Sequence, residues 1–336
     1  MGEFDLIERY FKAPARDMAQ RNSAVAQGIG DDCALLQPAA GMQLAISSDM
    51  LVEGRHFFAD VDPLTLGHKA LAVNLSDLAA CGAKPLAFTL ALALPQADEA
   101  WLAPFSRGLL ALAAEHNCAL IGGDTTQGPL NICITVFGEV PKNQALLRNA
   151  AKVGDDIYVS GTLGDARLAL EVMRGNLVLS NEAFIAAKAR LETPTPRIAL
   201  GMALRGIASS AIDVSDGLQG DLGHVLQQSA VGAVIDAAVV TQLLAINLIA
   251  TQVIKTTVNS QFTSQKQLQY ALSGGDDYEL AFTASVSKRQ AVQAAALASN
   301  TPVTRIGQIE AEPGLRLIDA QGQTVPNIFA SFDHFQ

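Results

Sequence analysis

The stretch LGHKALAVNLSDLAACGAKPLAFTLALALP, residues 66–95, is the longest apolar region of the chain and changes its periodicity partway along. Its first part, LGHKALAVNLSDLAACG, has the apolar spacing of a helix, whereas LAFTLALAL is a short run typical of a buried strand. Four polar residues interrupt the region: Lys69, Asn74, Asp77 and Lys84. A membrane-spanning helix would accommodate them only at high cost, so we expect a helix and a strand of a soluble protein.

The alternation of strands and helices continues on both sides of this stretch. MQLAISSD predicts a strand ending in polar residues, CALIGGD and NICITVFGEV predict further strands, and DEAWLAPFSRGLLALAAEHN predicts a helix. After the polar stretch RNAAKVGDD, we expect a strand at DIYVSG, helices around 164–174, 181–190 and 196–208, a strand at SAIDVS and a helix from Gly217. YELAFTA, a helix near 287–299 and two short strands end the chain. The pattern predicts an α/β (α+β) fold with domains at residues 1–148 and 149–336.

Length and composition exclude several classes of protein. The 336 residues suit two domains of ordinary size, and 49% hydrophobic against 17% charged residues indicates a globular chain. A formal net charge of −10 argues against a nucleic-acid-binding protein, which needs a basic face for the phosphates. The same charge predicts that a phosphate ligand would arrive with metal ions. The polar region Thr241–Gln269, rich in Gln and Thr, predicts a variable insertion.

The cysteines and the N-terminus indicate a cytoplasmic protein. The four cysteines are far apart and form no CxxC pair, which predicts buried free thiols rather than a disulfide framework or a zinc site. The first residues, MGEFDLIERYFKAP, predict an amphipathic helix with Phe4, Ile7, Tyr10 and Phe11 on one face. They lack the basic start and the apolar core of a signal peptide.

Aspartates recur where apolar runs end in small residues. The clusters are Asp31–Asp32, Ser47–Ser48–Asp49, Asp77, Gly122–Gly123–Asp124, Asp213 with Asp216, and Gly274–Gly275–Asp276–Asp277. One aspartate after Ser or Gly is commonly a helix cap or turn residue. Six clusters that converged on one site would repel one another unless cations lay between them. Ligand sets made only of oxygen suit magnesium or calcium, and divalent ions with glycine N–H groups can cradle a polyphosphate.

The common nucleotide and hydrolase signatures are missing from the sequence. There is no GxxxxGKS/T loop, no protein-kinase signature, no HExxH and no GxSxG. GIGDDC fails as a dinucleotide fingerprint because Cys33 stands where the third glycine belongs. We therefore expect the chemistry to rest on the aspartates.

The motifs, in their order along the chain, resemble those of the thiamine-monophosphate kinases, a family of the aminoimidazole-ribonucleotide-synthetase-like superfamily. They are GEFDLIERYF, GIGDDCALL, HKALAVNLSDLAACGAKP, LIGGDTTQGPL, SAIDVSDGLQGDLGH, LSGGDDYEL and the terminal FDHF. The resemblance implies a homodimer in which the N-terminal ATP- and magnesium-binding domains pair their sheets, while the C-terminal domain closes the active-site cleft. It implies direct transfer of the γ-phosphoryl group of ATP to thiamine monophosphate, with several Mg²⁺ ions, giving thiamine pyrophosphate and ADP.

The resemblance also implies roles for single residues. The implied magnesium ligands are Asp32, Ser47, Ser48, Asp49, Asp77, Asp124, Asp213 and Asp216, of which Asp32, Asp77, Asp124 and Asp213 are the catalytic ones. The implied ATP contacts are Gly123, Asp124, Arg148 and Ser215, the implied thiamine contacts are His56, Asp276 and Phe329, and Asp31 is the implied supporting partner. The chain has SGGDD where the family commonly has SGGED, and Phe329 where a tryptophan is common. Both departures affect substrate geometry rather than the class of reaction.

Three alternatives remain on the residues alone. The first is another ATP-using branch of the superfamily; its selenophosphate branch is disfavoured because Cys33 lies inside the aspartate motif. The second is a two-metal phosphohydrolase, which also uses clustered carboxylates. The third is a non-catalytic calcium-binding protein, whose ligands usually occupy one continuous loop rather than a span of about 250 residues.

Overall fold

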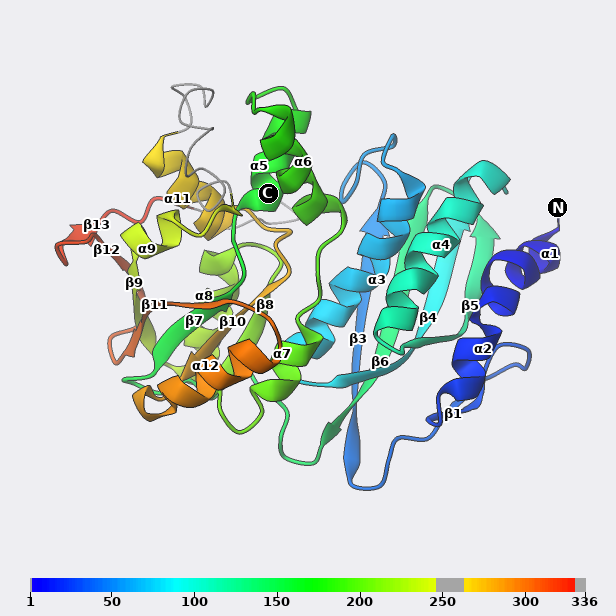
Figure 1. Cartoon of the computed structure of the whole chain (residues 1–336), viewed down its shortest axis with the longest axis horizontal. Helices are drawn as coiled ribbons and strands as arrows, with labels where there is room; N and C mark the ends of the chain where they lie inside the picture. Colours follow the sequence, from blue (N-terminus) through cyan, green and yellow to red (C-terminus); the bar gives the residue numbers. More distant parts are fainter. Residues whose placement is uncertain (1, 246–262, 330–336) are drawn as a thin grey trace. The chain divides into compact units, whose positions relative to one another are not determined.

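The computed structural model describes residues 2–245 and 263–329 (Figure 1). The chain divides into two compact units, an N-terminal unit of residues 1–78 and 83–145 and a C-terminal unit of residues 79–82 and 146–336. Most of the region expected to be an insertion, and all of the terminal FDHF motif, lie outside the described residues.

A four-stranded sheet forms the centre of the N-terminal unit. In spatial order its strands are β3 (Met42–Val52), β6 (Asn131–Pro141), β4 (Lys84–Leu94) and β5 (Ala119–Gln127). The β3–β6 and β6–β4 pairs are antiparallel, whereas β4 and β5 are parallel. Helix α4 (Glu99–Glu115) provides the crossover that a parallel pair requires. Strands β3 and β5 are consequently the two edges of the sheet.

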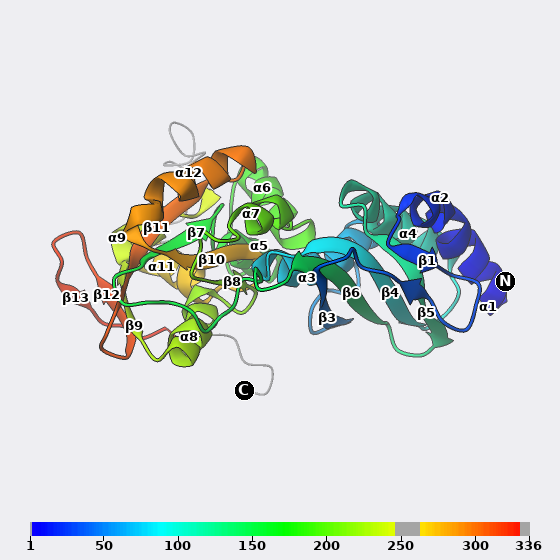
Figure 2. The same cartoon turned by 90° about the horizontal axis from the view of Figure 1, so that it is seen from below.

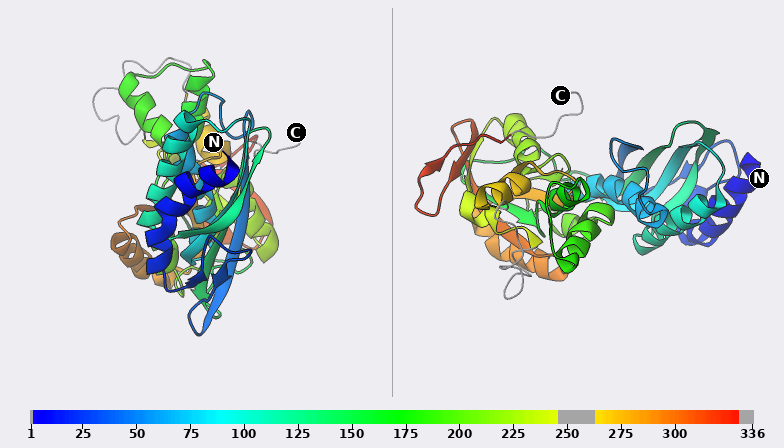
Figure 3. Two further views of the ribbon diagram at one scale, coloured as in Figure 1. Left: turned by 90° about the vertical axis from the view of Figure 1, so that its right-hand side faces the viewer. Right: turned by 90° about the horizontal axis from the view of Figure 1, so that it is seen from above.

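Helices α3 (Pro63–Ala80) and α4 cover one face of this sheet (Figures 2 and 3). The helix and the strand predicted from residues 66–95 are confirmed as α3 and β4. The two helices approach closely at glycines, because a Cβ at Gly67 would lie 2.1 Å from the Phe105 carbonyl oxygen and one at Gly108 would lie 1.9 Å from that of Leu64. Only glycine allows backbones to pack at this distance.

The N-terminal segment differs from the expected regular amphipathic helix. It consists of α1 (Glu3–Ile7), the π-helical turn η1 (Glu8–Lys12) and α2 (Ala13–Arg21), followed by the paired strands β1 (Val25–Gln27) and β2 (Leu35–Leu36). Tyr10 and Phe11 are buried as predicted, but Phe4 is 84% exposed. A π-turn contains one residue more than an α-turn, so it rotates Phe4 away from the packed face.

A mostly antiparallel sheet of seven strands forms the centre of the C-terminal unit. In spatial order its strands are β13 (Thr324–Val325), β12 (Gly314–Ile318), β9 (Gly232–Asp236), β11 (Val303–Glu310), β7 (Asp156–Ser160), β10 (Glu279–Ala284) and β8 (Ser210–Val214). Only the β9–β12 pair is parallel in this described sheet. Every residue of β7, β8 and β10 is buried, so these strands lie at the core of the unit.

Short helices surround this second sheet. They are α5 (Asp165–Met173), α6 (Asn181–Glu192), α7 (Ile198–Ala203), α8 (Leu218–Ser229), α9 (Ala237–Thr241), α11 (Ser264–Ser273), the 3₁₀ turn η3 (Val286–Lys288) and α12 (Arg289–Ala298). Within residues 2–245 and 263–329, none of the helices is both long enough and apolar enough to cross a bilayer.

Several local expectations are wrong. Ser47–Asp49 lie in the middle of β3 rather than at its end, because the strand keeps pairing with β6 as far as Val52. Strand β5 likewise continues beyond Asp124. The helix expected at 196–208 is confined to α7, and three strands, not two, end the described chain. All four thiols are free as predicted, but only Cys118 is buried: Cys81 and Cys133 are half-buried, and Cys33 is exposed.

Buried ion pairs link the elements of the C-terminal unit. Glu279 of β10 is fully buried and accepts charged hydrogen bonds from Arg190 at 2.6 Å and Arg197 at 2.5 Å. Asp156 of β7 is also fully buried and pairs with Arg289 at 2.6 Å and with Arg305 at 3.4 Å. The hydrogen bonds from Arg289 hold the pKa of Asp156 below its usual range.

The Asp156–Arg289 pair makes stability depend on acid pH. Because the pKa of Asp156 is lowered in the fold, its ionised form stabilises the protein above the unfolded pKa of about 3.9, and this contribution disappears as the pH falls further. Arg289→Met should lower the free energy of unfolding near neutral pH, because it removes the main partner of the buried Asp156 carboxylate, and should flatten the acid dependence. Denaturant unfolding between about pH 2 and pH 7 measures both effects.

Arg16→Met is the matched control for Arg289→Met, because Arg16 forms a surface ion pair with Glu8 at 3.2 Å in which both side chains are exposed. Such pairs contribute about 0–1 kcal/mol, so this variant should keep the acid dependence of the parent protein. Identical acid profiles for the two variants would contradict the role of Arg289.

Candidate functional site

Strand β3 and helix α3 hold one group of polar side chains. The Ser47 hydroxyl donates a hydrogen bond to Asp77 Oδ2, and the Asp49 backbone N–H donates to Asn74 Oδ1 at 3.0 Å. Asn74 and Asp77 are three residues apart on α3 and therefore share a helix face. Ser47 and Asp49 are alternate residues of β3 and share its helix-covered face. These four residues, the β3–α3 cluster, combine two carboxylates with a hydroxyl and an amide.

Ser48 lies on the opposite face of the same strand. Its hydroxyl donates to the Ile134 carbonyl oxygen at 3.1 Å and lies 2.9 Å from Thr135 Oγ1 on the neighbouring strand β6. The side chains of Ser47 and Ser48 therefore serve different faces of the sheet, although both were expected to assist metal binding.

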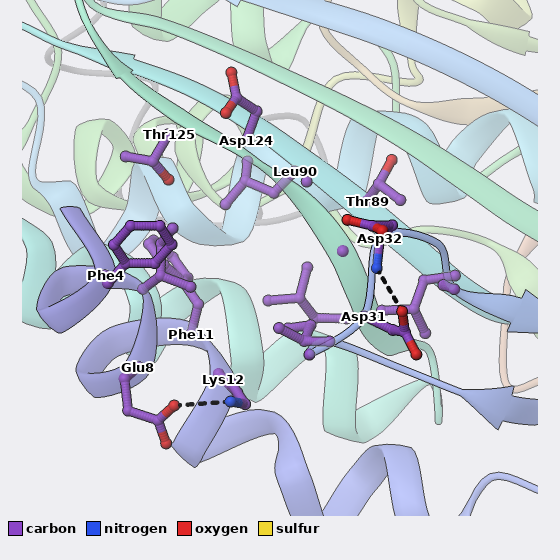
Figure 4. Close-up of a pocket in the computed structure, with 18 of the residues that line it drawn as sticks. Phe4, Glu8, Phe11, Lys12, Asp31, Asp32, Thr89, Leu90, Asp124 and Thr125 are labelled. Atoms are coloured by element: carbon purple, nitrogen blue, oxygen red, sulfur yellow. Dashed lines mark hydrogen bonds and ion pairs between the residues drawn. The ribbon is translucent and has the colours of Figure 1, made fainter.

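A pocket of about 910 Å³ lies at the other edge of the sheet, and Gly123 and Asp124 of β5 line it together with Asp31 and Asp32 (Figure 4). Asp31 Oδ1 accepts a hydrogen bond from the Asp32 backbone N–H at 2.9 Å. Gly123 has φ +145°, and a Cβ there would lie 1.8 Å from the Leu90 carbonyl oxygen, so the position requires glycine. We call this the β5 pocket.

The β3–α3 cluster and the β5 pocket lie at opposite edges of the four-stranded sheet. Strands β6 and β4 separate β3 from β5, which amounts to three strand spacings, or about 14 Å. In the strand register Asp49 lies in one cross-strand row with Gly123, and Asp124 lies in the next row, where side chains point to the other face. One copy of this sheet therefore does not place Asp49 and Asp124 on the same ion.

His56 lies in the turn that follows β3. Its backbone N–H donates to the Val52 carbonyl oxygen at 3.0 Å, and its ring Nδ1 accepts from the Val52 backbone N–H at 3.0 Å. The neutral imidazole therefore carries its proton on Nε2. The turn fixes both the tautomer and the orientation of this half-buried ring, at the end of the strand that carries Asp49.

In the C-terminal unit, the loop after β8 carries three predicted site residues. Asp213 is a buried residue of β8, and Ser215 and Asp216 follow the strand. The backbone N–H groups of Ser215 and Asp216 both donate to Asp221 Oδ2 at 3.0 Å. Burial raises the pKa of Asp221 to about 7. Asp221, in the first turn of α8, thus holds the backbone of this loop.

A second loop, residues 274–278, packs backbone to backbone against the first. The Asp276 N–H donates to the Ser215 carbonyl oxygen and the Tyr278 N–H to that of Val214, both at 2.8 Å. Asp276 and Tyr278 have φ values of 60° and 50°, which are uncommon for residues other than glycine. The Tyr278 hydroxyl donates to Asp276 Oδ1 at 3.3 Å. These bonds place Asp276 beside Ser215.

Charged groups buried beneath this second loop support its conformation. Both carboxylate oxygens of Asp277 accept from the Gly164 N–H, at 3.0 and 2.9 Å, and Arg190 donates to the Asp277 carbonyl oxygen at 3.3 Å. Burial raises the pKa of Asp277 well above its usual range. The same Arg190 pairs with Glu279, so the loop is tied to strand β10.

Arg148 lies on the surface beside strand β8. Its carbonyl oxygen accepts from the Ser229 hydroxyl at 3.1 Å, and the carbonyl oxygen of its neighbour Leu147 accepts from the Ala211 N–H at 3.2 Å. The backbone of Arg148 is therefore fixed while its side chain is exposed.

Phe329 lies near the start of helix α8. Its carbonyl oxygen accepts from Gln219 Nε2 at 2.6 Å, and its ring packs on the hydrophobic core of the C-terminal unit. Since Gln219 is in the first turn of α8, Phe329 is held close to the loop that carries Ser215 and Asp216.

The donor chemistry fits magnesium, although no complete metal cage is formed. Among the residues that the structure describes, no three His, Cys, Asp or Glu side chains form a group that could hold an ion. Mg²⁺ usually takes one or two carboxylates and completes its shell with water and phosphate oxygens. Asp49 and Asp77 supply carboxylates in the β3–α3 cluster, and Asp32 and Asp124 supply them at the β5 pocket, so both places offer the oxygen ligands that this ion prefers.

Sequence reasoning assigned no role to Asn74, Asp221 or Tyr278. Asn74 and Asp77 were recognised as sharing a helix face, and that spacing was the available signal for Asn74. Asp221 lies in SDGLQGDLGH just after a glycine, where an acidic side chain in a first helical turn indicates capping. No local pattern indicates the Tyr278 contact, because it depends on a left-handed backbone.

Both units match one family of known proteins. The AIR synthase related protein N-terminal domain matches residues 30–140, and the AIR synthase related protein C-terminal domain matches residues 152–320. The two-domain fold with mixed α and β structure is therefore that of the AIR synthase related proteins.

Individual relatives narrow this assignment. Thiamine-monophosphate kinase of Salmonella typhimurium is 45% identical over 99% of this chain and 98% of its own length. The crystal structure of thiamine-monophosphate kinase from Stenotrophomonas maltophilia has a TM-score of 0.83 at 43% identity, covering 97% of this chain and 98% of that one. A structure of AaThiL complexed with AMPPCP and TMP has a TM-score of 0.73 at 27% identity, covering 99% and 97%. The chain belongs to the thiamine-monophosphate kinase family.

The contacts of Asp221 predict its effect on the β8 loop. Asp221→Ala removes the acceptor of the Ser215 and Asp216 N–H groups, so hydrogen exchange of these two amides should become at least about tenfold faster. Asp221→Asn keeps one acceptor oxygen and should give an intermediate rate. Hydrogen exchange resolved to single amides measures the change; unchanged rates at 215 and 216 in the alanine variant would contradict the role of Asp221.

Proposed function

We propose that this chain transfers the γ-phosphoryl group of ATP to thiamine monophosphate, giving thiamine pyrophosphate and ADP. The observation that carries the proposal is the 45% identity to a thiamine-monophosphate kinase over essentially the whole chain. The structure of AaThiL with AMPPCP and TMP, a likeness covering 99% of this chain, supports the same pair of substrates.

The acceptor explains why the chain needs no general base. A phosphate monoester carries a charge of about −1.5 to −2 near neutral pH, so its oxygen is already a nucleophile. The barrier is the repulsion between two anions, and catalysis consists of positioning and electrostatic stabilisation. Magnesium ions, when bound, supply the neutralising charge. The hydrogen bond from Ser47 orients the Asp77 carboxylate for this task, and the bond from Asp49 to Asn74 fixes β3 beside it.

We assign the site residues as follows. Asp32, Ser47, Asp49, Asp77, Asp124, Asp213 and Asp216 hold magnesium, and Ser48, whose hydroxyl bonds to β6, assists this set from the other face of β3. Gly123, Arg148 and Ser215 contact ATP, and His56, Asp276 and Phe329 contact the thiamine moiety. Three local geometries support the assignment: the β3–α3 cluster, the β5 pocket, and the paired loops after β8 and before β10.

We further propose a homodimer formed through the N-terminal sheets. Leu44, Ile46 and Met50 of β3 point away from the helices and are 44%, 60% and 52% exposed. An apolar row on an edge strand favours burial against a partner. Two sheets that pair through a two-fold axis can place β3 of one copy beside β5 of the other. The β3–α3 cluster of one copy then lies beside the β5 pocket of the other. The dimer would thus bring together the two groups of carboxylates that a single sheet keeps about 14 Å apart.

The charge of the chain fits small-molecule substrates in the cytoplasm. A net charge of −10 disfavours binding to the anionic phosphates of nucleic acids or membranes, so we propose neither as a partner.

The reaction itself gives the first test of this proposal. Purified chain with ATP, thiamine monophosphate and Mg²⁺ should form thiamine pyrophosphate and ADP in equal amounts, as measured by chromatography. Asp77→Asn and Asp124→Asn should each reduce turnover by more than about tenfold, because each removes a charge at a metal site. Asp60→Asn, an exposed residue of the same unit, should leave turnover within about twofold of the parent.

The products separate the competing functions. Inorganic phosphate without thiamine pyrophosphate would indicate a phosphohydrolase instead. Near-normal rates in either metal-site variant would remove that residue from the assigned ligands.

The dimer can be tested at the exposed face of β3. Ile46→Glu buries a charge in the proposed interface, so the protein should sediment as a monomer and lose most of its activity. Val178→Glu places the same charge on an exposed apolar residue of the C-terminal unit and should leave the dimer intact. Analytical ultracentrifugation distinguishes the two; a dimeric Ile46→Glu variant would contradict the proposed interface.

A further inference from the structure

The β5 pocket is bounded on one side by the N-terminal helical segment, to which no role has been assigned. Besides Asp32, Gly123 and Asp124, its lining includes Glu8 and Lys12 of the π-turn η1 (Figure 4). Phe4 and Phe11 add an aromatic wall on the same side. A pocket of about 910 Å³ that combines aromatic surface with polar groups has the size and character of a nucleotide site.

The electrostatics of this pocket single out one residue. Among the described residues that line it, Lys12 is the only basic one, whereas Asp5, Glu8, Asp31, Asp32 and Asp124 are acidic. A polyphosphate entering this site with its metal ions would therefore meet one protein cation. A lysine ammonium carries three donors on a flexible stem and suits a phosphate oxygen as a point charge.

The ion pair between Lys12 and Glu8 is weak enough for a ligand to replace it. Lys12 Nζ lies 3.1 Å from Glu8 Oε2, and both side chains are more than a third exposed. An exposed pair of this kind contributes about 0–1 kcal/mol. Arg16 also pairs with Glu8, at 3.2 Å, so Glu8 keeps a cationic partner when Lys12 leaves it.

The end of the Lys12 side chain lies next to Gly30, which precedes the aspartate motif. Gly30 has φ +132°, and a Cβ at this position would lie 3.8 Å from Lys12 Cε and 3.9 Å from Nζ. The ammonium group therefore already lies against the backbone that leads into Asp31 and Asp32. Exchange of Glu8 for a ligand in the pocket therefore needs only a rotation of the flexible Lys12 stem.

From these contacts we infer that Lys12 is a nucleotide-binding residue, which leaves Glu8 and binds a phosphate oxygen of ATP in the β5 pocket. The inference rests on the proposed function, since it takes ATP as the ligand of Gly123 and Asp124. The N-terminal helical segment then forms part of the nucleotide site. The role of the π-turn η1 is to place Lys12 beside the aspartate motif.

The test compares Lys12→Met with Arg16→Met in the full chain. Both variants remove one cationic partner of Glu8, but only Lys12 lines the pocket. Calorimetric titration with Mg²⁺ and AMPPCP, without thiamine monophosphate, should show roughly tenfold weaker binding for Lys12→Met, since a charged hydrogen bond is lost. Arg16→Met should match the parent, and Lys12→Arg should restore most of the affinity.

Kinetics give a second, independent readout. The KM for ATP should rise roughly tenfold in Lys12→Met while the KM for thiamine monophosphate stays within about twofold. Equal AMPPCP affinities in Lys12→Met and Arg16→Met would overturn the inference. If the parent protein forms no thiamine pyrophosphate, the proposed function fails, whereas the titration still decides whether Lys12 binds the nucleotide.

Discussion

Repulsion between carboxylates is the constraint around which this protein is arranged. A site that joins two phosphorylated reactants through divalent ions needs many acidic side chains, yet these destabilise one another when no cation is bound. The described residues limit the conflict by separation: none of their His, Cys, Asp or Glu side chains form a group of three that could hold a metal ion, and the predicted acidic ligands divide between two edges of one sheet and the loops of a second unit. Hydrogen bonds such as Ser47 to Asp77 hold single carboxylates in place.

The secondary structure was largely accessible from the sequence where apolar periodicity is strong. Helix α3 and strand β4 follow directly from residues 66–95, because the helical spacing of apolar residues in the first part and the short continuous apolar run in the second are distinct patterns. The polar residues Ser47 and Asp49 were misleading, since polar residues after an apolar run usually mark a loop. They lie within β3 because α3 presents Asn74 and Asp77 to them, and a local pattern does not contain that partner.

The acidic side chains of the candidate site could be identified in the sequence, whereas the groups that hold them in place could not. Gly164 and Asp277 are 113 residues apart, and their contact depends on the complete C-terminal sheet. The separation of Asp49 from Asp124 depends on strand order, which periodicity does not determine. Sequence patterns therefore identify the chemical groups, and only the topology determines which of them share a pocket.

The geometry around Asp276 explains how a shorter carboxylate is accommodated where the family commonly has glutamate. Its φ of 60° lies in the left-handed region, which aspartate adopts more readily than longer side chains do. The backbone bonds to Ser215 and Val214 hold residues 276 and 278 in this conformation, and the Tyr278 hydroxyl contacts the Asp276 carboxylate at 3.3 Å. The position of this carboxylate is thus determined mainly by the backbone of two paired loops. A change of one methylene in the side chain alters its reach, but the loops that carry it stay tied to β8 and β10.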